Sequence, residues 1–314
     1  MADHNVVAVP QHKGYWYDAS RPTTDKRVTN LLRDVAFNRE SMNDGHHRSP
    51  FDNQRVMVGT DGIEVRLVQG IDEEAFKRTL SMATRATIGL DLEGETMDSL
   101  FAKDTRDWEE MLQGGLQTAL ETQVIVFAVS GVSRTCTHQL VRSRKASFHQ
   151  QSQRASSYGD WPEARCPESV WNNDRARAAW LQAKHYSDIA YQVALQEDIS
   201  YQDARFVLLE GTNNYIMCEY SVREFMNVFA YRGCSMFSWE IVHVMREMRR
   251  LLIEAHPWMA PYVKISCEAS QRCTFQGWET VEGQCDFPWA KESNRVFQPK
   301  FHKIDHRTTD TKEK

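Results

Sequence analysis

An apolar run at residues 124–131 is followed closely by a segment rich in arginine at residues 142–154, and this order restricts the possible folds. The run reads Val-Ile-Val-Phe-Ala-Val-Ser-Gly, a composition typical of a buried strand. The segment carries Arg142, Arg144 and Arg154 among serines and glutamines. A guanidinium binds phosphate through a planar fork of donors and keeps its charge at physiological pH. The sequence therefore predicts an anion-binding pocket close to the end of a buried strand.

The length and charge of the chain exclude several classes of partner. It has 314 residues and a formal net charge of -5, so no global charge attracts nucleic acid or an anionic membrane. No apolar run approaches the roughly 20 residues that span a bilayer, and the polar start lacks the apolar part of a leader. The seven cysteines are scattered and lack the Cys-x-x-Cys spacing of common zinc sites. We expect a cytoplasmic protein with free thiols and with no metal, nucleic-acid or membrane partner.

Composition divides the chain into three parts. Residues 1–65 form a polar N-terminal extension rich in turn-forming residues, which favours loops over a packed core. Residues 66–265 hold the predicted strands and helices. Residues 266–314 form a C-terminal extension that ends in a charged tail, which we expect to be disordered.

Local patterns predict the secondary structure of the central part. Residues 63–68 and 124–130 are predicted strands, whereas 213–220 could be a strand or a turn. The polar segment 145–165 is predicted to be a loop. Helices are predicted at 73–86 with Asp72 as N-cap, and at 107–119, 132–142, 168–196, 201–210, 223–230 and 238–255.

Helical spacing would place polar side chains on common faces. Gln139 and Arg142 are three residues apart, and Arg223 and Asn227 are four apart, so each pair is expected to share a helix face. Taken singly, an arginine on a helix is typical of a solvated surface. Together with the segment at 142–154, these side chains predict that several arginines converge on more than one phosphate.

A longer pattern around these residues resembles a known family. The run His138-Gln139-Leu140-Val141-Arg142-Ser143-Arg144, seven residues and then Ser152-Gln153-Arg154 is similar to the signature Arg-His-Arg, seven residues, Ser of the flavin-dependent thymidylate synthases, the ThyX family. Three further elements agree with that family: Gly131-Val132-Ser133-Arg134, Ala204-Arg205-Phe206-Val207-Leu208 and Trp239-Glu240-Ile241. The resemblance covers roughly residues 66 to 263.

The resemblance implies a fold, an assembly and a reaction. The fold is α/β (of the α+β kind), with a curved antiparallel sheet and long helices, and residues 66–265 are its catalytic domain. The assembly is a homotetramer with FAD at subunit interfaces. The reaction moves a one-carbon unit from 5,10-methylenetetrahydrofolate to C5 of dUMP, with reduced flavin as hydride donor and NADPH as reductant of the flavin. The cofactor supplies the redox chemistry, and the protein supplies position and charge.

The resemblance also implies roles for individual side chains. Those implied to bind the nucleotide are Gln139, Gln150, Ser152, Arg154, Arg205 and Arg232. Those implied to bind FAD are Thr87, Thr118, Arg142, Arg144, Arg223 and Asn227. Those implied to be catalytic are Arg142, Ser152 and Arg232. Fixed guanidinium groups suit this chemistry, because the activated uracil gains negative charge at its oxygens.

The chain departs from the family at four histidine positions, which hold Leu116, Thr122, Ser143 and Met236. The cationic nucleotide contacts are retained, so we expect nucleotide binding to persist while the flavin, folate or sugar contacts differ. This pattern favours a specialised relative that methylates UMP, as some members of nucleoside-antibiotic pathways do.

Three alternatives remain open from the sequence. They are a housekeeping synthase that converts dUMP to dTMP, a 5-hydroxymethylating enzyme, and a non-catalytic relative that binds nucleotide or flavin. Product mass separates the first two from each other, and tight binding without turnover identifies the third.

Overall fold

The computed structural model describes residues 55–88, 108–113, 117–159 and 162–273. All of them belong to one compact unit, residues 55–314. Most of the predicted N-terminal extension, and the part of the predicted C-terminal extension beyond residue 273, lie outside the described residues.

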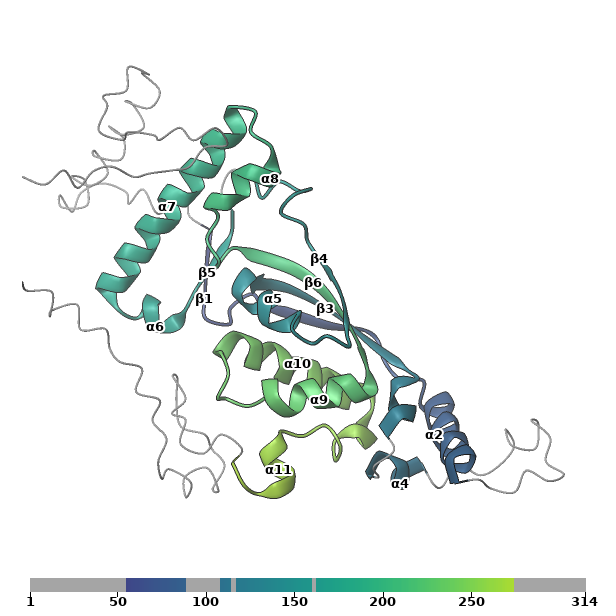
Figure 1. The fold of residues 1–314 in the computed structure, drawn as a ribbon. Coiled ribbons are helices and arrows are strands. Elements are labelled where there is room, and N and C mark those ends of the chain that lie inside the picture. Colours follow the sequence, from purple (N-terminus) through teal and green to yellow (C-terminus); the bar gives the residue numbers. More distant parts are fainter. Residues whose placement is uncertain (1–54, 89–107, 114–116, 160–161, 274–314) are drawn as a thin grey trace, which may run out of the picture. The chain divides into compact units, whose positions relative to one another are not determined.

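A four-stranded antiparallel sheet forms the centre of this unit (Figure 1). Its strands, in spatial order, are β2 (Glu64–Gln69), β3 (Val124–Ser133), β6 (Asn213–Ser221) and β4 (Ser147–Gln150). Two short parallel strands, β1 (Val56–Val58) and β5 (Ala164–Cys166), form a second sheet. The mixed fold with an antiparallel sheet confirms the predicted fold class.

One face of the large sheet is buried because its strands alternate. Side chains of successive strand residues point to opposite faces, and those that are fully buried include Ile125, Phe127 and Val129 on β3 with Ile216, Cys218 and Tyr220 on β6. The predicted strand at 124–130 is confirmed, and the uncertain segment 213–220 is a strand.

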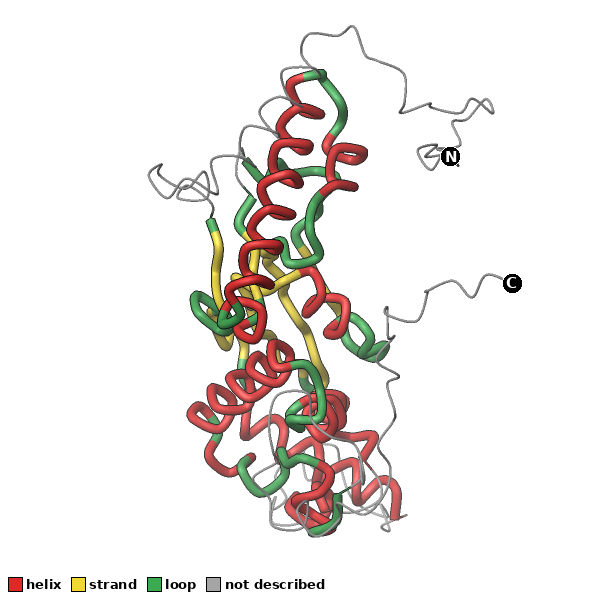
Figure 2. The backbone as a smooth tube through the Cα atoms, turned by 90° about the vertical axis from the view of Figure 1, so that its left-hand side faces the viewer, coloured by secondary structure: helices red, strands yellow, loops and turns green. Residues whose placement is uncertain are grey.

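Three helices cover the buried face. They are α5 (Arg134–Leu140), α9 (Val222–Arg232) and α10 (Trp239–Ala255). Phe225 of α9 stacks on Phe127 of the sheet, with ring centroids 5.3 Å apart. In Figure 2 the strands run between the long upper helix, α7 (Asp174–Gln196), and the group of helices that includes α9 and α10.

The remaining described helices lie in the connections between strands or after the last strand. They are α2 (Glu73–Ile88), α4 (Trp108–Gln113), η1 (Gln117–Glu121), α6 (Glu168–Trp171), α8 (Tyr201–Ala204), η2 (Arg205–Val207), η3 (Pro257–Met259) and α11 (Ser266–Ser270). The predicted cap of α2 is confirmed, because the Ala75 N–H donates to Asp72 Oδ1 at 3.0 Å. Among the described residues, no helix is both long and apolar enough for a membrane span.

Several predictions about the elements were wrong. The segment 145–165, predicted to be a loop, contains β4 and most of β5, because pairing with β6 and β1 stabilises such short strands. The helix predicted at 168–196 is interrupted because the Asn173 side chain accepts from Ala176 N–H and begins α7. The helix predicted at 201–210 ends with η2 at Val207.

Candidate functional site

Two arginines of the predicted nucleotide group meet at one glutamine. Arg154 follows β4, and its Nε donates to Oε1 of Gln202 on α8 at 2.9 Å. Arg205 begins η2, and its Nε donates to the backbone oxygen of Gln202 at 3.0 Å. Neither guanidinium uses its Nη atoms in a hydrogen bond to any described residue. Both therefore keep paired donors for an anion in the same neighbourhood.

The adjoining part of the nucleotide group is attached to α5. Gln150, the last residue of β4, donates through Nε2 to Oγ1 of Thr137 at 2.8 Å. Thr137 lies on the helix that also carries Gln139. The exposed Ser152 hydroxyl accepts the backbone N–H of Arg154 at 3.2 Å. The structure thus places Gln150 at the end of β4, and Ser152 and Arg154 in the loop that follows it.

The two central arginines of the motif lie on a turn. Helix α5 ends at Leu140, so Arg142 follows the helix and does not share its face with Gln139, contrary to the prediction. The Arg142 N–H bonds Gln139 O at 3.4 Å, which closes the turn. Arg142 and Arg144 are both exposed. This turn reaches α9, because the backbone N–H and the positive charge of Lys145 act on the Glu224 carboxylate.

The predicted flavin group is gathered around the start of α9. Ser221 caps this helix by accepting the Glu224 N–H at 3.2 Å. Arg223 Nη1 contacts Glu121 Oε1 of η1 at 2.8 Å, which joins α9 to the short helix that carries the exposed Thr118. Asn227 is exposed one turn further along α9. Arg223 Nε is buried and has no hydrogen-bond partner among the described residues.

Two members of the predicted site remain apart from these groups. Arg232 ends α9, half-buried, with its guanidinium 4.7 Å from the Phe237 ring centroid. Burial lowers the pKa of Arg232, which still remains protonated at neutral pH. Thr87 belongs to α2, but its side chain lies outside the described residues.

The positions that depart from the family pattern have ordinary local contacts. The Thr122 hydroxyl donates to Ala119 O at 2.9 Å. Ser143 and Met236 are half-buried, and Leu116 lies outside the described residues. His149, within the motif, alternates with Phe148 and Gln150 and pairs with Glu219 Oε1 at 3.0 Å. Its imidazole therefore points to the sheet face opposite α5.

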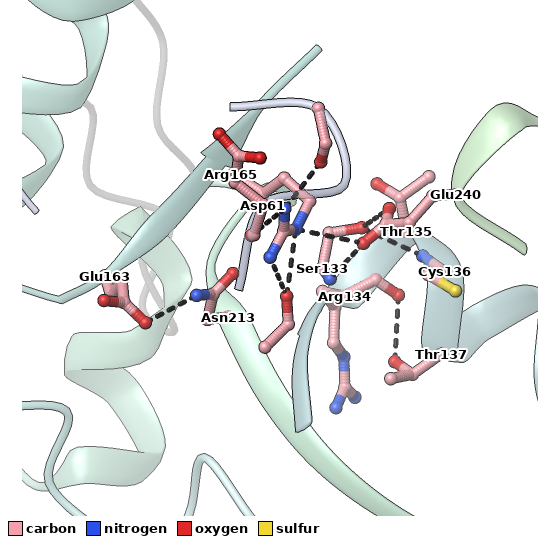
Figure 3. Close-up of polar contacts among 12 residues, drawn as sticks. Asp61, Ser133, Arg134, Thr135, Cys136, Thr137, Glu163, Arg165, Asn213 and Glu240 are labelled. Atoms are coloured by element: carbon pink, nitrogen blue, oxygen red, sulfur yellow. Dashed lines mark hydrogen bonds and ion pairs between the residues drawn. The ribbon is translucent and has the colours of Figure 1, made fainter. Parts of the chain in front are cut away.

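A buried polar cluster was missed by sequence reasoning (Figure 3). Glu240 of α10 accepts from the Ser133 N–H at 2.6 Å and from the Ser133 hydroxyl at 2.5 Å. Arg165 of β5 lies 3.5 Å from the same carboxylate, measured from Nε to Oε1. The side chains of Arg165 and Glu240 are 1% and 5% exposed, so the pair is shielded from water. We call Ser133, Arg165 and Glu240 the buried cluster.

Burial shifts both charged members of the buried cluster. It raises the pKa of Glu240, an effect opposed by the hydrogen bonds from Ser133 and by the charge of Arg165. It lowers the pKa of Arg165, opposed mainly by Glu240. Ser133 and Glu240 belong to two of the family elements found in the sequence, so their pairing could have been suspected. Arg165 stands in a segment predicted to be a loop and gave no such signal.

Two other features of the described residues bear on the chemistry. No group of three or more histidine, cysteine or acidic side chains is arranged to hold a metal ion in this part of the chain. The cysteines of this part are free thiols, at positions 136, 166, 218, 234, 267 and 273. Burial raises the pKa of the Cys218 thiol to about 12, so it is protonated at neutral pH.

Comparisons with known proteins agree with the pattern of these residues. The sequence model of a family described as "Thymidylate synthase complementing protein" matches residues 71–258, more than half of the chain. The flavin-dependent thymidylate synthase of Geobacter sulfurreducens is 33% identical over 183 residues, covering 58% of this chain and 78% of the relative. That of Sulfurisphaera tokodaii is 31% identical over 200 residues, covering 62% and 75%.

A solved structure is also similar, that of the UMP/dUMP methylase PolB from Streptomyces cacaoi bound with 5-Br dUMP. Its TM-score is 0.49 at 18% identity, and the likeness covers 66% of this chain and 94% of that one. The family model and the curated relatives decide the matter: the chain belongs to the thymidylate synthase complementing protein family, the flavin-dependent thymidylate synthases.

Proposed function

We propose that this protein transfers a one-carbon unit from 5,10-methylenetetrahydrofolate to C5 of a uridine monophosphate, with UMP preferred over dUMP, to give the 5-methyl nucleotide. FAD, reduced by NADPH, supplies the hydride when it is bound. The proposed catalytic domain is residues 66–265, acting as a homotetramer with FAD at subunit interfaces.

The observation that carries the proposal is the meeting of Arg154 and Arg205 at Gln202. Each guanidinium is held through Nε, so its Nη donors are oriented but unused within the described residues. Two such forks suit the three acceptor oxygens of a nucleotide phosphate better than they suit a neutral ligand. Ser152 supplies a hydroxyl beside them. We therefore assign the phosphate to Ser152, Arg154 and Arg205, and the base and sugar to Gln139 and Gln150.

The residues around α9 fit a flavin dinucleotide. The buried Nε of Arg223 has no partner among the described residues, and a buried donor of this kind favours an acceptor such as a pyrophosphate oxygen. The exposed Asn227 and Thr118 add an amide and a hydroxyl next to it. Arg142 and Arg144 lie on the turn that faces α9, between the flavin group and β4.

In the chemical step, the protein contributes positively charged side chains that stabilise negative charge on the uracil. Arg232 is half-buried and packs on Phe237, and a cation in such a place stabilises negative charge on a uracil oxygen better than it does in water. We assign Arg232 and Arg142 to the pyrimidine, and Ser152 to the positioning of the nucleotide.

The proposed preference for UMP is based on two features: the family histidines that this chain replaces and the arginines that it retains. Three of the four altered positions lie among the described residues, and none of them carries an ionisable side chain, whereas the arginines assigned to the phosphate are present. A site altered in this way keeps its hold on the phosphate while its contacts elsewhere differ.

A competition assay tests the proposal. Purified protein with FAD, NADPH and methylenetetrahydrofolate is given UMP and dUMP at equal concentration, and the products are identified by mass. The expected result is a gain of one CH2, mainly on UMP. A gain mainly on dUMP would contradict the preference, an added oxygen would indicate hydroxymethylation, and binding of either nucleotide without product would indicate a non-catalytic relative.

A further inference from the structure

We propose that Arg165 and Glu240 are a positioning pair: they fix the first turn of α5, and through α5 they place Gln139 and Gln150 against the nucleotide. The inference rests on the proposed function for the role of these two glutamines. It assigns to the pair no contact with the substrate.

The first step runs from Glu240 to the helix start. Ser133 Oγ donates to Glu240 Oε2 at 2.5 Å and accepts the Cys136 N–H at 3.0 Å. The carboxylate thus accepts the hydrogen bond of the Ser133 hydroxyl, which leaves a lone pair of Ser133 Oγ directed toward the helix. Ser133 is the N-cap of α5, and such a cap satisfies a backbone donor that the helix leaves unpaired. Glu240 also accepts the Ser133 backbone N–H, so one side chain orients both donors of the cap residue.

The second step runs from α5 to the nucleotide residues. α5 is only seven residues long, so a displaced first turn moves the whole helix. Thr137, in the second turn, receives the side-chain amide of Gln150 at 2.8 Å and itself donates to Arg134 O at 3.0 Å. Gln139 lies on the same helix and Arg142 begins the turn after it. A shift of the cap would therefore reach both glutamines and the motif arginine.

The third step concerns Arg165, which holds the carboxylate in place. Its Nη1 donates to Gly59 O at 2.5 Å and to Asp61 O at 2.9 Å, and its Nε donates to Gly131 O at 2.9 Å. Nη2 also bonds Gly131 O. Gly131 lies in the bulge of β3, two residues before Ser133, and its φ of +71° is a conformation that favours glycine. The guanidinium thereby ties the turn after β1 to the bulge that precedes the cap.

The chemistry of the pair favours a positioning role over a purely stabilising one. Apolar side chains of similar volume often stabilise a core as well as a buried ion pair does. They cannot accept two hydrogen bonds from Ser133, as a carboxylate does. Figure 3 shows the Arg134 side chain turned away from the buried cluster. The partners of the Glu240 carboxylate are therefore Ser133 and Arg165.

The test separates stability from position by replacing the pair with apolar residues. Four variants are compared with the wild type: Glu240→Leu, Glu240→Leu combined with Arg165→Met, Ser133→Ala, and a control in which Lys184→Met is combined with Asp188→Leu. The control removes another buried ion pair, Lys184 Nζ to Asp188 Oδ2 at 2.5 Å on α7, which among the described residues makes no hydrogen bond to α5. Each protein is measured for its urea midpoint, for amide hydrogen exchange of α5 without nucleotide, and for UMP affinity by calorimetry.

We expect the double variant to regain most of the urea midpoint that Glu240→Leu loses. Its α5 amides, Cys136 above all, should still exchange faster than in the wild type. UMP should bind roughly tenfold more weakly, because a small displacement of binding groups has a large effect. Ser133→Ala should also accelerate α5 exchange and weaken UMP binding, although its ion pair is intact. The control should leave α5 exchange unchanged.

Two results would overturn the inference. One is a folded double variant or Ser133→Ala protein that binds UMP with wild-type affinity. The other is α5 exchange that the control variant accelerates as much as the double variant. If the double variant does not fold, Ser133→Ala decides. A wild-type protein that binds neither UMP nor dUMP would instead contradict the proposed function, and α5 exchange would still report on the pair.

Discussion

Arg165 and Arg154 differ in what their guanidinium groups already bind. Arg165 is buried, and its donors are used by the carbonyl oxygens of three residues and by Glu240. Arg154 is exposed and is held only through Nε by Gln202. The first arrangement engages Nε and both Nη atoms inside the protein, whereas the second leaves exposed Nη donors without a partner among the described residues. Whether an arginine has a structural role or is available to a ligand can therefore be inferred from which of its N–H donors already have partners.

The largest effect is expected from Arg165→Met. The change leaves Glu240 buried without its cation, and breaking one side of a buried pair costs about 3–5 kcal/mol of unfolding free energy. Urea denaturation followed by circular dichroism measures this. A loss below about 1 kcal/mol, the range of exposed pairs, would remove the distinction between the two arginines.

Arg154→Ala should have the next largest effect, on binding alone. Loss of a charged hydrogen bond to phosphate should raise the Kd for UMP roughly 10- to 100-fold, while the urea midpoint stays unchanged. Arg175→Ala is the matched control, since Arg175 is an exposed arginine on α7 outside both groups. Equal losses of UMP affinity in both variants would show that net charge, and not this site, binds the nucleotide.

Arg223→Ala should act on the flavin. The variant loses the donor that is buried without a partner, so the purified protein should contain less FAD, read from its visible absorbance per chain. UMP affinity should fall less than in Arg154→Ala. The reverse order of effects in these two variants would mean that the nucleotide and flavin groups have been exchanged.

The smallest effect is expected from Ser143→His, which restores the histidine of the family motif. Ser143 lies in the turn between α5 and β4 and makes no side-chain bond to a described residue. A new donor there should tighten FAD by a few-fold at most, roughly the worth of one neutral hydrogen bond. Flavin titration checks this, and an unchanged affinity would mark the substitution as neutral.

Sequence reasoning succeeded where the signal is local. The apolar run of β3, the cap at Asp72 and the end of the predicted helix 238–255, observed as α10, each depend on neighbouring residues. It failed for β4 and β5, because a strand of only three or four residues exists only when a partner strand is beside it.

In the candidate site, too, some residues could be predicted from local sequence, whereas their contacts could not. The family resemblance pointed to Arg154 and Arg205. Their shared partner, Gln202, was not predicted, because the contact depends on the packing of α8 beside the chain after β4. Glu240 bonds a residue 107 positions away, a contact that no window of sequence contains. Whether a given arginine is buried or free follows from such contacts and not from its local sequence.

In the proposed reaction the protein builds a 5-methyl group on a uridylate. The most direct test uses methylenetetrahydrofolate labelled with carbon-13 in its methylene group, together with FAD, NADPH and UMP, and follows the label by NMR and mass spectrometry. The account predicts that the label appears in a methyl group attached to C5 of the nucleotide. Label found in a hydroxymethyl group, or a nucleotide recovered unlabelled from protein that binds both UMP and FAD, would contradict it.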